Sequence, residues 1–155
     1  MVTNKILLQL MSIKKKWKVE YPDSYFKDRL FTDTKRLESF KQEYRFIAKY
    51  INQGCVLDIG CSSGEFLETI AWRGSRYGME VSDLAIREAM KRNISFDKDI
   101  FNSEDYFDLI IYRGTIQHIE TPFLYLKDSF DSLKKGGLVA FLATPNSRSI
   151  YYKIW

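Results

Sequence analysis

The segment VLDIGCSSGEF, residues 56–66, joins the pattern of a buried strand to a glycine-rich turn. The strand pattern is apolar except for Asp58, and the turn that follows holds Gly60, Ser62 and Gly64. Glycine adopts backbone angles closed to other residues and lets the backbone approach a ligand, and the free amides of a following helix face the same place. The sequence therefore predicts a ligand site at this turn.

The spacing of the turn argues against a phosphate ligand. A dinucleotide site favours G-x-G-x-x-G, which brings backbone amides against a pyrophosphate, and the glycines here do not fit that spacing. Asp58, two positions before Gly60, would repel a phosphate. It could instead fix a loop amide or help to hold a cationic amino-acid group.

Short apolar runs alternate with helical patterns after Gly54. These patterns predict strands at residues 56–59, 77–81, 94–96, 107–112 and 138–144, and helices at residues 65–72, 83–91 and 122–134. Ser82 is the expected cap of the second helix, and Thr121 with Pro122 begins the third. The alternation predicts an α/β fold with a doubly wound, mostly parallel, Rossmann-like sheet and helices on both faces.

The first 53 residues differ from the rest in charge and in pattern. They carry 12 basic and 6 acidic side chains, whereas residues 54–155 carry 12 and 14. Apolar residues at helical spacing predict a basic amphipathic helix over residues 2–17 and a second helix over residues 30–51. We therefore expect a helical extension (1–53) before an α/β domain (54–155). The first helix either packs on its own domain or contacts a membrane surface or a partner.

Composition disfavours several classes of protein. The formal net charge of +4 is small and dispersed, so nucleic acid is not expected as a partner. Cys55 and Cys61 lie six residues apart without a second cluster, which fits neither a zinc site nor a disulfide framework. The apolar runs are far shorter than the ~18 residues of a membrane span. We expect a cytoplasmic protein without a bound metal.

Glu80 ends the second predicted strand, 20 residues after Gly60. A carboxylate at this distance along the chain can accept hydrogen bonds from both hydroxyls of an adenosine ribose. Nicotinamide enzymes share this feature, and a solvated strand end would give the same pattern. Glu80 is therefore a candidate nucleoside ligand.

Four segments, VLDIGCSSGEFL, YGMEVSD, YFDLIIYRGTIQHIETP and SLKKGGLVAFLATPN, follow one another in the chain. In this order and spacing they resemble class I S-adenosylmethionine-dependent methyltransferases, and above all the branch that includes the ubiquinone-biosynthesis O-methyltransferases. The resemblance covers about residues 40–148 and implies that the cofactor is S-adenosylmethionine. N-terminal helices often cover the cofactor in this family, so residues 1–53 are expected to form a cap or lid.

The resemblance implies roles for residues around the turn. Asp58 would orient the turn near the methionine moiety, Gly60 and Gly64 would allow close approach, and Glu80 would hold the ribose. The adenine amine would meet Asp99, with Ile100 beside the ring and Asp97 as the alternative carboxylate. Further expected cofactor contacts are Cys61, Ser62, Val81 and Arg113, where Ser62 replaces the middle glycine of the family.

Methyl transfer from a sulfonium requires mainly that donor and acceptor are held in line. A base is needed only if the acceptor must lose a proton. His118, the one histidine, is the candidate catalytic base, with a structural role as the alternative, and Tyr112 and Arg113 could line the acceptor pocket. We expect O- or N-methylation of a small-molecule acceptor. The alternatives are a non-catalytic nucleoside-binding module and, less favoured by the turn spacing, a nicotinamide oxidoreductase.

The family sheet ends with an antiparallel pair of strands, and the 11 residues 145–155 are too few for a helix and two strands. We therefore expect a sheet without that pair, as in a shortened or incomplete chain. Residues 138–144 would then form an edge strand. An unpaired apolar edge is a template for self-association.

Overall fold

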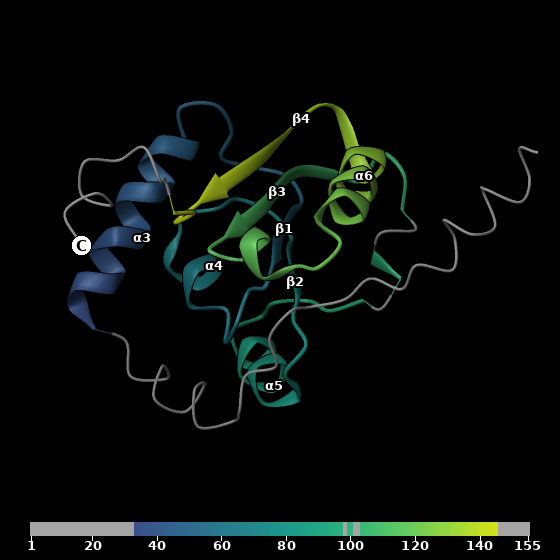
Figure 1. Ribbon diagram of the computed structural model, residues 1–155. Helices are drawn as coiled ribbons and strands as arrows, with labels where there is room; N and C mark the ends of the chain where they lie inside the picture. The colour runs from purple at the N-terminus through teal and green to yellow at the C-terminus, as the bar shows by residue number, and fades with distance from the viewer. Residues whose placement is uncertain (1–32, 98, 101–102, 146–155) are drawn as a thin grey trace, which may run out of the picture.

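The computed structural model describes residues 33–145 except residues 98, 101 and 102. The elements of this part, labelled in Figure 1, are α3 (Thr34–Ile47), β1 (Val56–Ile59), α4 (Glu65–Thr69), β2 (Arg76–Met79), α5 (Asp83–Lys91), β3 (Phe107–Arg113), the 3-10 helix η2 (Ile116–His118), α6 (Pro122–Ser132) and β4 (Leu133–Leu142). The predicted helix over residues 2–17 lies outside the described residues. No helix in the described part is long and apolar enough to cross a membrane.

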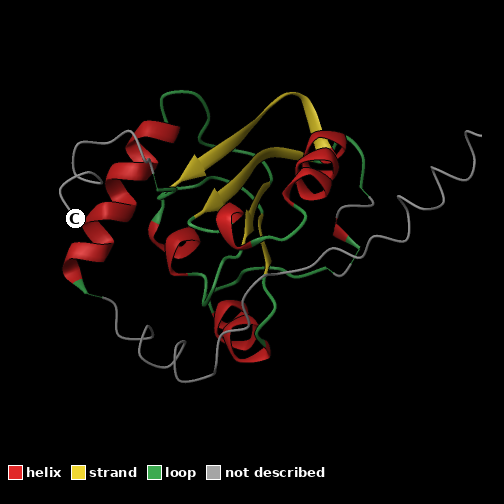
Figure 2. Cartoon of the chain, viewed as in Figure 1, coloured by secondary structure: helices red, strands yellow, loops and turns green. Residues whose placement is uncertain are grey.

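A parallel four-stranded sheet with strand order β2-β1-β3-β4 forms the centre of the molecule (Figure 2). Val56 of β1 lies opposite Arg76 of β2 on one side and opposite Leu109 of β3 on the other. The chain thus runs from β1 to one edge, returns past β1 to β3 and continues to the other edge. This is the doubly wound arrangement that the alternation of elements predicted.

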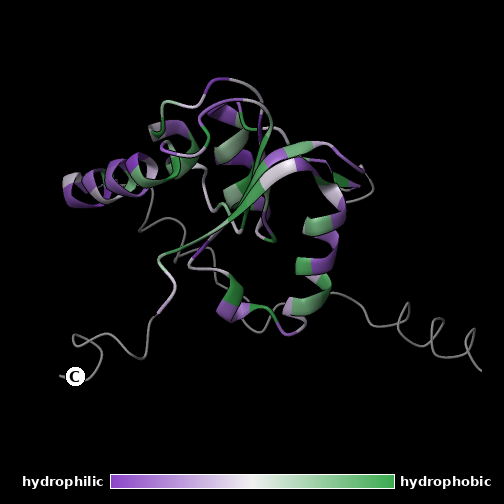
Figure 3. Ribbon diagram, turned by 90° about the horizontal axis from the view of Figure 1, so that it is seen from above, coloured by the Kyte–Doolittle hydropathy of each residue, from purple (hydrophilic) through white to green (hydrophobic). Residues whose placement is uncertain are grey.

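Helices cover both faces of the sheet, as expected. Alternate residues of a strand point to opposite faces, and two hydrophobic cores result. One core joins the sheet to α3, α4 and α5, and the other joins it to η2 and α6. Figure 3 shows alternating hydrophilic and hydrophobic bands along the helices, which accords with one face of each helix packing inward.

Helix α3 belongs to the core although it lies within the predicted N-terminal extension. The Asp33 side chain caps it by accepting a hydrogen bond from the Lys35 amide at 3.1 Å. Phe40 and Ile47 are buried in the core that also contains Val56. The division of the chain at residue 53 stays a prediction, but α3 and the sheet share one core.

Several predicted boundaries were wrong by a few residues. Helix α4 ends at Thr69 rather than at residue 72, because Ile70 turns to extended backbone. Residues 94–96 form a bridge through Ser95 rather than a full strand, since only Ser95 exchanges backbone hydrogen bonds with β2. Strand β4 begins at Leu133 and not at residue 138, because α6 ends at Ser132 and Leu133 already lies opposite Phe107.

Strand β4 lies at one edge of the sheet, and in the described part of the chain it pairs only with β3. Its side chains Leu138 and Phe141 are 38% and 50% exposed. A groove of about 280 Å³ runs between β4 and the C-terminal turn of α3, where Phe46 and Tyr50 are also exposed. The edge strand β4 therefore combines exposed apolar side chains with backbone groups that pair with no second strand in the described part of the chain.

We predict that the chain self-associates through β4. Leu138→Lys should abolish association, because a charge on an edge strand prevents pairing with a second edge. Sedimentation at tens of micromolar (about the range in which exposed edges associate) measures the effect. Phe130→Lys, which removes an exposed aromatic ring from α6, is the matched control. A monomeric parent chain would contradict the prediction.

Candidate functional site

The glycine-rich turn after β1 is fastened to the end of β2. The backbone amides of Gly60 and Cys61 both donate to the Met79 carbonyl, at 2.7 and 3.2 Å. Beyond the turn, Gly64 begins α4 in the left-handed conformation. The predicted ligand site therefore lies at the carboxyl ends of two parallel strands, where ligands of doubly wound folds bind.

The glycines of the turn are required by packing within the protein. Gly60 and Gly64 have φ angles of 78° and 81°, which favour glycine. A Cβ on Gly60 would lie 2.5 Å from Thr115 Oγ1, and a Cβ on Gly64 would lie 2.2 Å from Ile94 Cδ1. The expected close approach to a ligand stays a prediction, since it is protein atoms that crowd both positions.

Glu80 holds the turn through hydrogen bonds to backbone amides. Its carboxylate accepts from Ser62 N at 3.0 Å, from Val81 N at 2.6 Å and from Ser82 N at 3.2 Å. Two carboxylate oxygens offer about four acceptor positions in total. Glu80 thus joins the end of β2 to the turn and keeps capacity for a further donor such as a ribose hydroxyl.

Asp58 is a buried carboxylate at the centre of the sheet. It is 2% exposed, and no hydrogen-bond partner of Oδ1 is found among the described residues. Burial raises the pKa of Asp58 to about 7; Arg113 opposes this shift, and Glu80 and Glu43 add to it. A buried carboxylate of this kind favours a cationic partner.

Ser62, in the turn four residues after Asp58, is a second polar residue with an unused atom. Its φ angle is 52°, a region that costs a residue with a side chain roughly 1–2 kcal/mol. Its buried Oγ also lacks a hydrogen-bond partner in the described chain. Asp58 and Ser62 each offer an unused oxygen that can accept a hydrogen bond from an ammonium group, which is the chemistry that the amino-acid end of S-adenosylmethionine requires.

Arg113, an expected cofactor contact, is held by a helix that the sequence interpretation did not connect to the site. Its guanidinium pairs with Glu43 of α3 through two hydrogen bonds, of 2.6 and 3.1 Å. It also stacks 4.4 Å from the ring centre of Phe40 and 5.6 Å from that of Phe66. Glu43 gave no sequence signal, because only the fold brings α3 against the end of β3.

The predicted adenine contacts lie in a segment that the structure describes in part. Ile100 is buried in the core shared with α6, whereas Asp99 and Asp97 are exposed and the Asp99 amide donates to Asp97 Oδ1 at 2.9 Å. Val81, beside Glu80, is 47% exposed. Contact of these residues with adenine stays a prediction.

The predicted roles of Tyr112, in β3, and His118, in η2, stand differently against the structure. Tyr112 is fully buried, and its hydroxyl lies 2.7 Å from Ser129 Oγ of α6, so the expectation that it lines an acceptor pocket is wrong. Strand alternation turns it into the core, where burial raises its pKa to about 12. His118 is half-buried at the end of η2, and its amide donates to the Thr115 carbonyl. Its role as a base stays a prediction.

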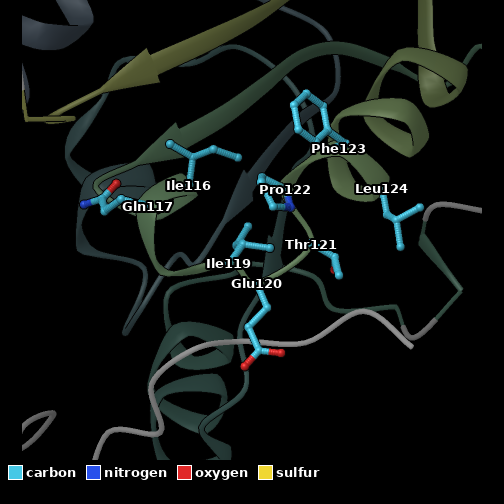
Figure 4. A pocket seen from close by; sticks show the side chains of 8 residues that line it. All are labelled: Ile116, Gln117, Ile119, Glu120, Thr121, Pro122, Phe123 and Leu124. Atoms are coloured by element: carbon cyan, nitrogen blue, oxygen red, sulfur yellow. The ribbon is translucent and has the colours of Figure 1, made fainter. Parts of the chain in front are cut away.

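A pocket of about 640 Å³ lies beside η2 and the start of α6 (Figure 4). Its walls are mostly apolar, with one carboxylate and one carboxamide among the lining residues Ile116, Gln117, Ile119, Glu120, Thr121, Pro122, Phe123 and Leu124. The sequence interpretation did not identify this pocket. The available signal was the group of apolar residues Ile116, Ile119, Phe123 and Leu124 in the segment after β3.

We predict that Asp58→Asn stabilises the protein increasingly as the pH rises. At pH 4 the folded state keeps Asp58 protonated, whereas the unfolded carboxyl, with its ordinary pKa near 4, is already about half ionised. By pH 8 the folded state must also ionise Asp58, against its raised pKa. The parent therefore loses stability between these values, by as much as about 4 kcal/mol, and the variant does not. Denaturant unfolding at both pH values measures the difference, and a constant difference would contradict the raised pKa.

We also predict that Gly60→Ala and Thr115→Ala are coupled. Gly60→Ala should lower the free energy of unfolding by about 2 kcal/mol or more, through its φ angle and its clash with Thr115. Thr115→Ala removes the clashing atoms, so the double variant should recover about 1 kcal/mol or more relative to additivity. Additive effects in urea unfolding would show that the contact is unimportant.

Two curated relatives, a carboxymethyltransferase and a methyltransferase, are named for different substrates. The tRNA U34 carboxymethyltransferase of Campylobacter jejuni subsp. doylei is 28% identical over 151 residues, which is 88% of this chain and 51% of the relative. The ubiquinone biosynthesis O-methyltransferase of Parvibaculum lavamentivorans is 31% identical over 101 residues, or 58% and 40%. The chain thus spans about half or less of the length of these relatives.

Solved structures share the fold. A SAM-dependent methyltransferase from Aquifex aeolicus matches with a TM-score of 0.63 and 19% identity, over 79% of this chain and 72% of its own. One from Archaeoglobus fulgidus matches with a TM-score of 0.62 and 22% identity, over 84% and 62%. The family model described as a methyltransferase domain matches residues 29–154. The chain therefore belongs to the methyltransferase-domain family, which confirms the resemblance to class I S-adenosylmethionine-dependent enzymes.

Proposed function

We propose that this chain binds S-adenosylmethionine at the turn after β1 and supports transfer of its methyl group to a small-molecule acceptor. The observation that carries the proposal is the buried carboxylate of Asp58, with an unused oxygen beside a turn held by Glu80. A cationic ligand group would compensate the buried charge. Family membership supports the same ligand.

The residues around the turn suit different parts of the cofactor. Asp58 and Ser62 would bind the amino-acid end, where their unused oxygens lie. Glu80 would accept from the ribose, because its carboxylate retains acceptor capacity beside the turn. Asp99 and Ile100 would flank the adenine.

S-adenosylmethionine, when bound, supplies a methyl group on a positively charged sulfur that is already a good leaving group. The protein is then required to hold the acceptor in line and to exclude water. His118 would act as base only for an acceptor that must lose a proton. For any other acceptor His118 would have only a structural role in η2.

The pocket beside η2 is the proposed acceptor site. Its volume of about 640 Å³ falls in the range of small-molecule sites. Its first lining residue, Ile116, follows Thr115 in the chain, and the Thr115 side chain faces Gly60 of the turn. Its apolar walls with Glu120 and Gln117 favour an acceptor with an apolar body and a hydrogen-bond donor. An RNA acceptor, as in the name of one relative, would call for a basic lining instead.

Both cysteines are free thiols. Free thiols are typical of a reducing compartment, so the cytoplasm remains the proposed location.

Calorimetric titration with S-adenosylmethionine, S-adenosylhomocysteine and NAD tests the ligand. We expect both sulfur nucleosides to bind and NAD not to bind. Transfer of a labelled methyl group to panels of phenols, amines, sugars and tRNA then tests the reaction. Transfer to a small molecule supports the proposal, transfer to tRNA alone overturns the acceptor class, and binding without transfer indicates a binding module. NAD binding alone would overturn the whole proposal.

Glu80→Ala should weaken the binding of S-adenosylhomocysteine by about 2–4 kcal/mol, since the ribose loses a charged acceptor and the turn loses its fastening. Asp83→Asn, which changes an exposed carboxylate at the start of α5, is the matched control and should bind as the parent does. Calorimetry measures both variants. Equal affinity of Glu80→Ala and the parent would show that Glu80 has no part in nucleoside binding.

A further inference from the structure

Arg113 and Glu43 form an ion pair between β3 and α3 at the edge of the proposed cofactor site. The pair has two hydrogen bonds, from Nε and from Nη2 of Arg113, and both side chains are only about one-fifth exposed. Paired donors of one guanidinium fix its plane as well as its position. Ordinary ion pairs at the surface are more exposed and lack such paired hydrogen bonds, and they contribute little to stability.

Aromatic rings hold the same guanidinium on another side. Phe40 of α3 and Phe66 of α4 pack edge to face, with ring centres 5.5 Å apart. Arg113 lies over both rings, at 4.4 and 5.6 Å from their centres. Stacking and pairing together leave Arg113 one orientation, and they engage it with protein groups rather than leave it for a ligand.

Arg113 and Asp58 point to the same face of the sheet. Asp58 lies opposite Ile111 in the register of β1 and β3, and Arg113 is two residues further along β3. Because side chains two apart on a strand share a face, the guanidinium lies on the Asp58 side, towards α3 and α4. It is the cation that acts most strongly on Asp58.

Other charged and titratable groups surround Asp58 from each neighbouring element. Glu80 after β2 and Glu43 on α3 both disfavour its ionised form. Burial raises the pKa of the Cys61 thiol well above its usual value, so Cys61 stays neutral. Glu65 of α4 is paired with Arg36 of α3 at 3.2 Å. Arg113 is therefore the group that favours the carboxylate form of Asp58 against burial and two like charges.

We propose that Arg113, held in place by Glu43, is a positioning residue that favours the ionised form of Asp58 for the ammonium group of the ligand without touching the ligand itself. This inference rests on the proposed function. It assigns α3 a direct part in the site, because α3 supplies both Glu43 and Phe40. It also differs from the expectation that Arg113 contacts the cofactor or lines the acceptor pocket.

The affinity for S-adenosylhomocysteine between pH 5.5 and pH 8.5 tests the proposal. In the parent we expect the affinity to rise about tenfold between pH 6 and pH 8, as Asp58 ionises. Arg113→Met should move the midpoint upward by about one pH unit or more. Arg113→Lys, which keeps the charge, should restore most of the parent midpoint. Titration of the ligand's own amine affects every variant equally.

Two further variants control for folding and for charge. If Arg113→Met alone does not fold, the double variant Glu43→Gln with Arg113→Met avoids leaving Glu43 without its ion-pair partner. Its midpoint should still rise, since Arg113 acts on Asp58 more strongly than Glu43 does. Arg45→Met removes an exposed cation that pairs with Glu38 on the same helix, and it should leave the midpoint unchanged.

A second readout uses the protein without any ligand. Carbon-13 NMR of the Asp58 carboxyl should show a midpoint near pH 7 in the parent and a higher one in Arg113→Met. If Arg113→Met lost affinity for S-adenosylhomocysteine by the same factor at every pH, Arg113 would be a ligand contact. If its affinity were unchanged at every pH, Arg113 would have no role in binding. Either result overturns the inference. Failure of the parent to bind S-adenosylhomocysteine at any pH would instead overturn the proposed function, while the NMR midpoints still decide the role of Arg113.

Discussion

The burial of the Asp58 carboxylate in the central strand is the constraint on which the rest of the site depends. β1 is buried on both faces along its whole length, so any charge within it is removed from water. Such a charge is costly unless another group compensates it. The surrounding elements meet this requirement in part, through Arg113, and leave one oxygen of Asp58 unused. That incomplete compensation is what makes the strand end suitable for a cationic ligand.

The turn beside Asp58 is shaped by contacts from three other places in the fold. Glu80 fastens its amides from the end of β2, Thr115 limits Gly60 from the segment after β3, and Ile94 limits Gly64 from the segment after α5. A turn held on several sides is already organised before a ligand arrives. Less conformational freedom is then lost on binding, which favours affinity.

The proposed cofactor and acceptor sites draw residues from the two different cores of the protein. Asp58 and Arg113 face α3 and α4, whereas the pocket after β3 is built on Ile119, which packs in the core with α6. The carboxyl end of β3 connects the two regions, because Arg113 is followed by Gly114, Thr115 and then η2. Strand β3 thus connects Arg113, which compensates the charge of Asp58, to η2 and the start of α6, which line the proposed acceptor pocket.

The sequence by itself determined the class of fold, the position of the turn and the two carboxylates beside it, because strand and helix periodicity and glycine spacing are local properties of the chain. It also indicated Asp58 and Glu80, since the first lies within a strand and the second directly follows one. It did not show that Tyr112 is buried, that Glu80 binds the turn amides, or that Glu43 holds Arg113. These facts depend on which face each strand presents and on where α3 docks. Contacts between residues up to 70 positions apart have no local signal, so only the tertiary structure decided them.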